Sequence, residues 1–242
     1  MVFLRAFILL YAVYCAVIHG AVPVMILFPD MLFVDIHTHN DAGNPVAVVD
    51  NGAAGFCSVG IHPWRITEDW EQRFLEIRAL ARQPHVVAVG ECGFDYLKSP
   101  ASKEVQYELF KAHALLAEEV GKPLIIHLVK GQQELLRASN EIPHKQAWII
   151  HGFRGKPLQA QQLLSAGMYI SLGEMFNSDA VGVIPLGRLF IESDESAVSI
   201  AEIYEKIANV KGVEVEELAR CTIENARACN IFFADDNLLS TI

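Results

Sequence analysis

From Met31 onward the chain alternates short apolar runs with longer stretches in which apolar residues recur at helical spacing. This alternation is typical of βα units that build a parallel sheet. The apolar runs predict eight strands, at Leu32–Ile36, Val46–Val49, Gly55–Val59, Val86–Gly90, Leu124–His127, Trp148–His151, Met168–Ser171 and Arg188–Glu192. The helical spacing predicts six helices, at Glu68–Arg82, Ser102–Val120, Gln132–Asn140, Pro157–Ala166, Ser199–Asn209 and Glu214–Asn225.

These elements indicate an α/β protein with a TIM-like (β/α) barrel. Only short connections flank Val46–Val49, so we expect reduced helices in the first third of the barrel. Gly121-Lys122-Pro123 is a helix stop, and Pro157 suits a first helical turn. The 242 residues suffice for one large core, so we predict a single barrel domain over residues 31–242.

Residues 1–30 form a separate apolar segment. From Ala6 to Phe28 its only polar or ionisable interruptions are two tyrosines, one cysteine and one histidine, and the length is enough to span a bilayer. Three interpretations compete: a signal sequence, a membrane anchor, or an upstream extension, with translation starting at Met25 or Met31. Val17–Ala21 matches a signal cleavage site poorly, so we favour the upstream extension.

The composition indicates where the protein is located and which partners it can bind. The formal net charge of −10 argues against a broad nucleic-acid-binding surface, so any phosphate binding must be local. The five cysteines are odd in number and lack a C-x-x-C pair, which argues against a disulfide framework and a structural zinc site. We therefore expect reduced thiols and a cytoplasmic protein, with no membrane association unless residues 6–28 are retained.

Ionisable residues mark the carboxyl ends of several predicted strands. His37 and His39 are two residues apart, so an extended backbone points both imidazoles to the same face. The ends of later strands carry Glu91, His127, His151 and Asp194. In a parallel barrel all of these ends meet at one rim, which is where active sites of such barrels lie.

Burying so many titratable groups without a counter-ion would be costly, which predicts a bound divalent metal. Mixed imidazole and carboxylate ligands suit Zn²⁺ or Mn²⁺ well and Mg²⁺ less well, and six ligands are enough for two ions. In such a site Glu91 would bridge the two ions, and a metal-bound water with a pKa of about 7 would be the nucleophile. Asp194 would orient that water or take its proton, so Glu91 and Asp194 are the candidate catalytic residues.

Six motifs in order resemble those of the TatD family of metal-dependent hydrolases. They are Asp35–His39, Gly60–Trp64, Gly90–Tyr96, Lys122–His127, Ile150–Phe153 and Glu192–Asp194. The resemblance runs from about Met31 to Phe233, and it implies a TIM-like barrel, a divalent-metal centre and hydrolysis of phosphodiester bonds. Deoxyribonuclease activity is described for several members, so single-stranded DNA is a candidate substrate. By motif position the implied metal ligands are His37, His39, Glu91, His127, His151 and Asp194.

The chain also departs from the family pattern. The segment from Asn40 to Val59 is shorter than the βαβ segment usual in the family. Many members carry an arginine two residues after the histidine that His127 matches, whereas this chain has Val129 followed by Lys130. We expect Lys130, Arg65 or Arg154 to contact a substrate phosphate instead, and all three stay candidate substrate-binding residues.

Other polar residues have two interpretations each. His62 either lies near the metals, where it would contact substrate, or is a structural residue that hydrogen-bonds a backbone carbonyl. Asp95 either holds a ligand histidine in its tautomer or caps a turn after Gly93. A further three histidines lack partners in the sequence and receive no role: His85, His113 and His144.

Rival functions remain open. The Asp-x-His-x-His opening also resembles phosphoesterases of the polymerase-and-histidinol-phosphatase type, and amidohydrolases that cleave amides or lactones. The first resemblance would make the chain a phosphomonoesterase. The second would make it an amidohydrolase or lactonase that acts on a small molecule. A second rival is a catalytically silent metal-binding protein. The motifs Gly90–Tyr96 and Ile150–Phe153 favour the TatD interpretation.

Overall fold

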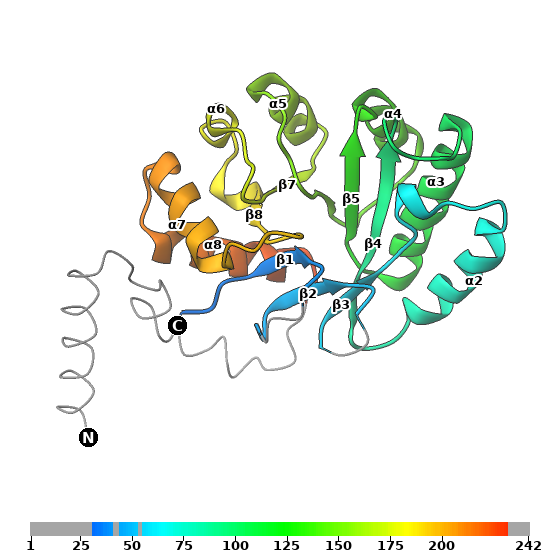
Figure 1. The fold of residues 1–242 in the computed structure, drawn as a ribbon, viewed down its shortest axis with the longest axis horizontal. Helices are drawn as coiled ribbons and strands as arrows, with labels where there is room; N and C mark the ends of the chain where they lie inside the picture. Colours follow the sequence, from blue (N-terminus) through cyan, green and yellow to red (C-terminus); the bar gives the residue numbers. More distant parts are fainter. Residues whose placement is uncertain (1–30, 41–43, 53–54, 232–242) are drawn as a thin grey trace. The chain divides into compact units, whose positions relative to one another are not determined.

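Eight parallel strands, paired in chain order, form the centre of the protein in the computed structural model, which describes residues 31–40, 44–52 and 55–231 (Figure 1). The strands are β1 Asp35–Thr38, β2 Ala47–Asp50, β3 Cys57–Val59, β4 Val86–Asp95, β5 Leu124–Val129, β6 Trp148–Ile150, β7 Tyr169–Leu172 and β8 Leu189–Ile191. All eight predicted strands are therefore present, and the predicted TIM-like barrel is confirmed.

Helices follow most of the strands. They are η2 Pro63–Arg65, α2 Trp70–Leu80, α3 Lys103–Val120, α4 Gln132–Glu141, α5 Pro157–Ser165, α6 Ser178–Val181, η3 Leu186–Arg188, α7 Ile200–Lys211 and α8 Val215–Ala228. The six predicted helices correspond to α2, α3, α4, α5, α7 and α8, whereas the short η2, α6 and η3 were not predicted. In the described parts of the β1–β2 and β2–β3 connections no helix occurs, as the short spacing predicts.

The barrel closes between its first and last strands. The Asp194 N–H donates to the His37 carbonyl at 3.0 Å, and the His39 N–H donates to the Asp194 carbonyl at 3.1 Å. These two bonds, with the parallel bridge of Thr38 and Asp194, join β1 to the residues just after β8. The same contact brings the two ends of the motif series, His37 with His39 and Asp194, to one place on the rim.

The core explains why the strands are continuous apolar runs. Every residue of β1 and β4 is buried, because helices cover the outside of a parallel barrel while side chains fill its inside. On α3, Phe110 packs against Phe94 of β4 and Trp148 of β6, with ring centroids 4.8 and 5.2 Å apart. On α7, the Tyr204 hydroxyl donates to the Val34 carbonyl at 2.8 Å and so attaches this helix to the chain entering β1.

The prediction of an apolar segment over residues 1–30 lies outside the described residues. Within the described ranges we find no helix with the length and hydropathy of a membrane span. The four cysteines in these ranges, Cys57, Cys92, Cys221 and Cys229, are free, as the absence of a disulfide pattern predicts. Cys92 is buried, and burial raises the pKa of its thiol well above the usual range, which fits the packing role that its place in a strand indicates.

His113, which received no role from the sequence, has a structural one. It is fully buried on α3, where its Nε2 accepts a hydrogen bond from the Ile61 N–H at 3.1 Å and its Nδ1 donates to the Leu109 carbonyl at 2.8 Å. The ring also packs edge-on against Phe74. Ile61 directly precedes His62, so neutral His113 holds in place the loop that carries His62 to the rim.

Acid should therefore destabilise the fold partly through His113. Burial lowers the pKa of His113 from 6.5 to about 4, so the unfolded chain takes up this proton at a higher pH than the folded chain. The stabilisation is complete above pH 6.5 and is lost as the pH falls toward 4, by about 3 kcal/mol in total. Urea unfolding at neutral pH and near pH 4 should show a smaller acid loss for His113→Gln than for the wild type. Equal losses in the two proteins would contradict this role.

Candidate metal centre

The six predicted ligands come together at the carboxyl ends of the strands. A cleft of about 670 Å³ opens there, and its lining includes His39, Glu91, His127, His151 and Asp194. The sixth, His37, is fully buried, and its Nε2 is 3.3 Å from Glu91 Oε2. Residues from β1, β4, β5, β6 and the end of β8 thus converge on one cluster, as the strand-end argument predicts.

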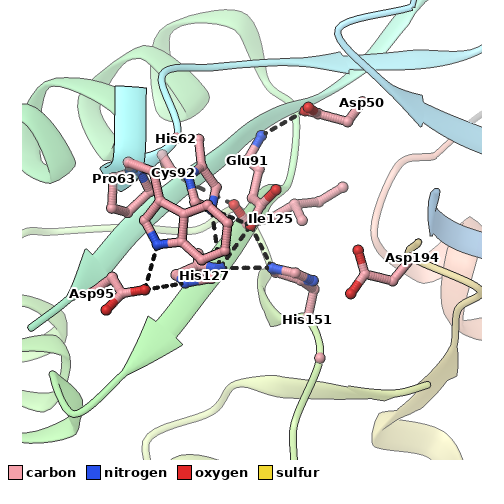
Figure 2. A network of polar contacts seen from close by, with 12 residues as sticks. Asp50, His62, Pro63, Glu91, Cys92, Asp95, Ile125, His127, His151 and Asp194 are labelled. Carbon is pink, nitrogen blue, oxygen red and sulfur yellow. Dashed lines mark hydrogen bonds and ion pairs between the residues drawn. The ribbon is translucent and has the colours of Figure 1, made fainter. Parts of the chain in front are cut away.

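Glu91 lies at the centre of the cluster (Figure 2). Its Oε1 is 2.8 Å from His127 Nδ1, 2.6 Å from His151 Nε2 and 3.1 Å from His62 Nε2. Burial alone would raise the pKa of Glu91, but its contacts with His151, His127 and His37 outweigh burial and hold this pKa far below its usual range. Glu91 is therefore an anionic centre with imidazoles on both of its oxygens, which is the geometry expected of a bridging carboxylate.

Asp194 and His39 complete the open side of the cluster. Asp194 Oδ1 is 3.6 Å from His39 Nε2 and 4.0 Å from His37 Nε2, and about a quarter of its side chain is exposed to the cleft. Partial burial raises the pKa of Asp194, and the nearby carboxylates Glu192 and Glu91 add to that effect. Asp194 is thus an acidic side chain that both touches the histidines and faces the cleft.

Asp95 fills both of the roles that the sequence left open. Its Oδ1 accepts the backbone N–H groups of Leu97 and Lys98, so it caps the turn after β4. Its Oδ2 is 3.2 Å from His127 Nε2 and accepts the Trp64 indole N–H at 2.5 Å. Burial tends to raise the pKa of Asp95, but these hydrogen bonds outweigh burial and lower it. Asp95 therefore fixes the ring of His127 with Nδ1 directed at Glu91.

Glu192 has the corresponding position behind His151 and was not assigned a role from the sequence. It is fully buried, accepts the Gly152 N–H on Oε1 at 2.5 Å, and lies 3.5 Å from His151 Nδ1. Burial tends to raise the pKa of Glu192, but the neighbouring His151 outweighs it and lowers this pKa. A carboxylate behind a histidine that faces the cluster is the usual support of a metal ligand.

His62 lies within the cluster as well. Its Nε2 is 3.3 Å from His127 Nδ1, and its Nδ1 accepts the Trp64 backbone N–H at 3.0 Å. The predicted hydrogen bond to a backbone carbonyl is thus replaced by one from a backbone N–H. His62 is both a structural residue of η2 and a neighbour of Glu91.

The donor set fits a divalent cation. His37 is fully buried, yet neither ring nitrogen has a hydrogen-bond partner, and His151 Nδ1 and Glu192 Oε2 also lack one. Buried polar atoms without partners are rare in folded proteins because each costs free energy. Imidazole nitrogens and carboxylate oxygens are ligands that Zn²⁺ and Mn²⁺ accept. Among the described residues, five groups of three side chains have ligand atoms within 4.8 Å of one another: His37, His39, Asp194; His37, Glu91, His151; His62, Glu91, His127; His39, Asp50, Glu91; and His151, Glu192, Asp194.

The predicted substrate-binding residues surround the cleft. Arg65, Lys130 and Arg154 are exposed and line it, together with Lys98, which was not predicted. Lys98 Nζ lies 4.4 Å above the ring of Trp64, whose side chain is also exposed at this edge. The exposed charged residues that line the cleft are thus these four cations and one anion, Glu195, although the chain as a whole is acidic.

A (β/α) barrel with this cluster of histidines and carboxylates at its strand ends defines a metal-dependent hydrolase. The chain belongs to the TatD family, since the family model described as TatD related DNase matches residues 31–230. The prediction of the family from six motifs is confirmed.

Individual relatives agree with this assignment. The chain is 30% identical over 206 residues to the uncharacterized metal-dependent hydrolase YcfH of Escherichia coli, over 76% of either chain. It is 27% identical over 203 residues to the Erwinia amylovora protein named 3′-5′ ssDNA/RNA exonuclease TatD, over 72% of this chain and 78% of that one. The crystal structure of YjjV, a TatD homologue from Escherichia coli, matches with a TM-score of 0.70 and 19% identity over 83% of this chain and 98% of that one.

Proposed function

We propose that the protein hydrolyses phosphodiester bonds in single-stranded DNA with the help of two divalent metal ions. The observation that carries the proposal is the combination of the metal-type cluster with the cationic mouth of the same cleft. The net charge of the chain is −10, so phosphates need a local group of cations. Four exposed side chains at the cleft can supply it: Arg65, Lys98, Lys130 and Arg154. The name of the Erwinia amylovora relative supports a single-stranded nucleic acid as substrate.

Trp64 adds a reason to favour a single strand over a duplex. Trp64 is 45% exposed and lines the cleft, and its indole N–H donates to Asp95. An exposed aromatic ring beside cationic side chains is a typical platform on which unpaired bases stack. Duplex bases are already stacked on one another and cannot use it without melting.

Different residues of the site have different roles in the proposed reaction. When bound, a divalent ion supplies Lewis-acid chemistry that lowers the pKa of water toward about 7 and polarises a phosphoryl oxygen. His37, His39 and Asp194 would hold one ion and His127 and His151 the other, with Glu91 between them. Asp194 faces the cleft and takes the proton of the attacking water. The cationic side chains at the mouth orient the phosphate and stabilise the added negative charge.

A substrate panel tests the proposal. The full-length protein, freed of metal and supplied with Mn²⁺ or Zn²⁺, should cleave an end-labelled single-stranded oligonucleotide faster than the same sequence as a duplex. EDTA should abolish cleavage, and added salt should weaken it because cationic residues bind the phosphates. A phosphomonoester and a lactone are the matched alternatives. Turnover of only one of these, or stoichiometric metal binding without any turnover, would overturn the proposal in favour of the corresponding rival function.

A further inference from the structure

Asp50 is a buried carboxylate beside the cluster that the sequence analysis did not single out. It ends β2, the strand with the shortest connections on either side, and only 3% of its side chain is exposed. Its Oδ2 is 3.7 Å from His39 Nδ1. Its Oδ1 accepts the Glu91 N–H at 3.3 Å (Figure 2). One carboxylate thus touches both the histidine at the open side of the cluster and the backbone of the central glutamate.

The neighbouring Asn51 holds this carboxylate in place. Asn51 adopts a left-handed conformation, with φ at 48°, which directs its side chain back toward Asp50. The amide Nδ2 donates to both carboxylate oxygens of Asp50, at 3.1 and 3.0 Å. The Asn51 Oδ1 accepts the Gly60 N–H at 3.4 Å, which links the pair to the loop that carries His62. The hydrogen bonds from Asn51 to both oxygens therefore restrain the orientation of the Asp50 carboxylate.

His39 is the histidine in greatest need of such support. Its side chain is 26% exposed, whereas that of His37 is fully enclosed and that of His151 is only 6% exposed. His127 has Asp95 behind it and His151 has Glu192, as described above. For His39 the carboxylate in the equivalent place is Asp50, facing Nδ1, while Nε2 faces Glu91 and Asp194 at 3.8 and 3.6 Å.

We propose that Asp50 is a positioning residue that orients His39 toward the metal. Its carboxylate, 3.7 Å from His39 Nδ1, favours the tautomer that carries the proton on Nδ1 and so leaves Nε2, on the cluster side, free of a proton. A histidine binds a metal through its unprotonated nitrogen, and the hydrogen bond at the other nitrogen sets which one that is. Asp50 acts through His39, whose Nδ1 faces Asp50 and whose Nε2 faces Asp194. Direct ligation is the alternative that the double-mutant cycle below tests, because the ligand atoms of Asp50, His39 and Glu91 lie within 4.8 Å of one another.

The direct test is Asp50→Asn, with metal affinity as the readout. Asparagine keeps an oxygen for the Glu91 N–H, but it removes the anionic acceptor that faces His39. The affinity of metal-free full-length protein for Mn²⁺ or Zn²⁺, measured by titration calorimetry, should fall about 10- to 100-fold. The control is Asp179→Asn, which removes the same charge from an exposed position on α6 and should leave the affinity unchanged. An unchanged affinity in Asp50→Asn would overturn the proposal.

A double-mutant cycle separates positioning from direct ligation. In a His39→Gln background, Asp50→Asn should cause little further loss, because the residue through which Asp50 acts is already gone. An equal loss in both backgrounds would show that Asp50 acts without His39, and would overturn the proposal.

Asn51→Gly provides a second variant if Asp50→Asn folds poorly. Glycine accepts the left-handed conformation of Asn51, so the substitution removes the bonds to Asp50, and the weaker one from the Gly60 N–H, without straining the backbone. Metal affinity should fall severalfold in this variant, while wild-type affinity would count against the proposal. None of these titrations contains a substrate, so their outcome is independent of whether the protein cleaves single-stranded DNA.

Discussion

Replacing Asp194 with asparagine should lower metal-dependent hydrolysis about 10³-fold and leave the fold intact. Asp194 has a φ of 54°, in the left-handed region where asparagine is among the best tolerated residues. Its backbone bonds to His37 and His39 close the barrel, and they do not depend on the side chain. The substitution therefore removes one thing only, the carboxylate that faces the cleft and lies 3.6 Å from His39 Nε2.

The loss should be large because Asp194 is placed for two tasks. It belongs to the group with His37 and His39 whose ligand atoms can share a cation, and it is the partly exposed carboxylate that can accept a proton from water. An amide is a weaker ligand and cannot accept that proton. His127→Ala should also abolish turnover, because it removes an imidazole in direct contact with Glu91 at 2.8 Å.

Turnover should be measured on a single-stranded oligonucleotide and on bis(4-nitrophenyl) phosphate at saturating Mn²⁺, with circular dichroism and urea unfolding to verify the fold. Asp179→Asn is the control, because it removes a carboxylate from an exposed residue of α6 that does not line the cleft and should keep near wild-type rates. Unchanged turnover in both Asp194→Asn and His127→Ala would mean that the cluster is not the active site.

The clustering of the candidate ligands was predictable because it depends on strand ends. Strands that are buried on both faces appear in the sequence as apolar runs, and a parallel barrel brings all of their carboxyl ends to one rim. These two rules are enough to bring His37, Glu91, His127 and Asp194 together, although up to 157 positions separate them in the chain.

Residues that support the ligands were harder to predict. Asp50 is the last residue of a short strand and belongs to no motif, and its partners His39 and Glu91 are brought to it only by the folded barrel. His113 appears on an amphipathic helix like any buried polar residue, and its partner Ile61 is 52 positions away. Such roles depend on tertiary contacts, which neither periodicity nor spacing along the chain encodes.

Strand β4 shows a different kind of error. The prediction ended it at Gly90, whereas the strand runs on to Asp95. The reason is that the glycines allow a close approach to the neighbouring strand. A Cβ atom on Gly90 would lie 2.3 Å from the Ile125 carbonyl oxygen, and one on Gly93 would lie 2.1 Å from that of His127. The residues that looked like a strand end are those that let β4 pair with β5 beneath the cluster.

Gly93→Ala should consequently destabilise the protein by about 4 kcal/mol, at the upper end of the range for single substitutions. Gly93 pairs with His127 in the sheet, and its φ is 141°, a conformation that residues with a side chain rarely adopt. The added methyl group would collide with a backbone oxygen, which cannot move aside as a flexible side chain can. Relief requires β4 and β5 to separate at the level of His127, so metal affinity should fall together with stability.

Gly121→Ala is the control that separates the steric collision of an added methyl group from the cost of placing a side chain at a positive φ. Gly121 ends α3 with a φ of 69°, also in the left-handed region, but a Cβ atom there would meet nothing within 4 Å. Its replacement should cost only about 1 kcal/mol, the ordinary penalty for a side chain in that conformation, and should leave metal binding unchanged. Urea unfolding of both variants measures the difference. Equal losses of unfolding free energy would mean that the close approach of β4 to β5 does not constrain Gly93. A larger loss in Gly93→Ala, together with weaker metal binding, would show that His127 keeps its position because residue 93 has no Cβ atom.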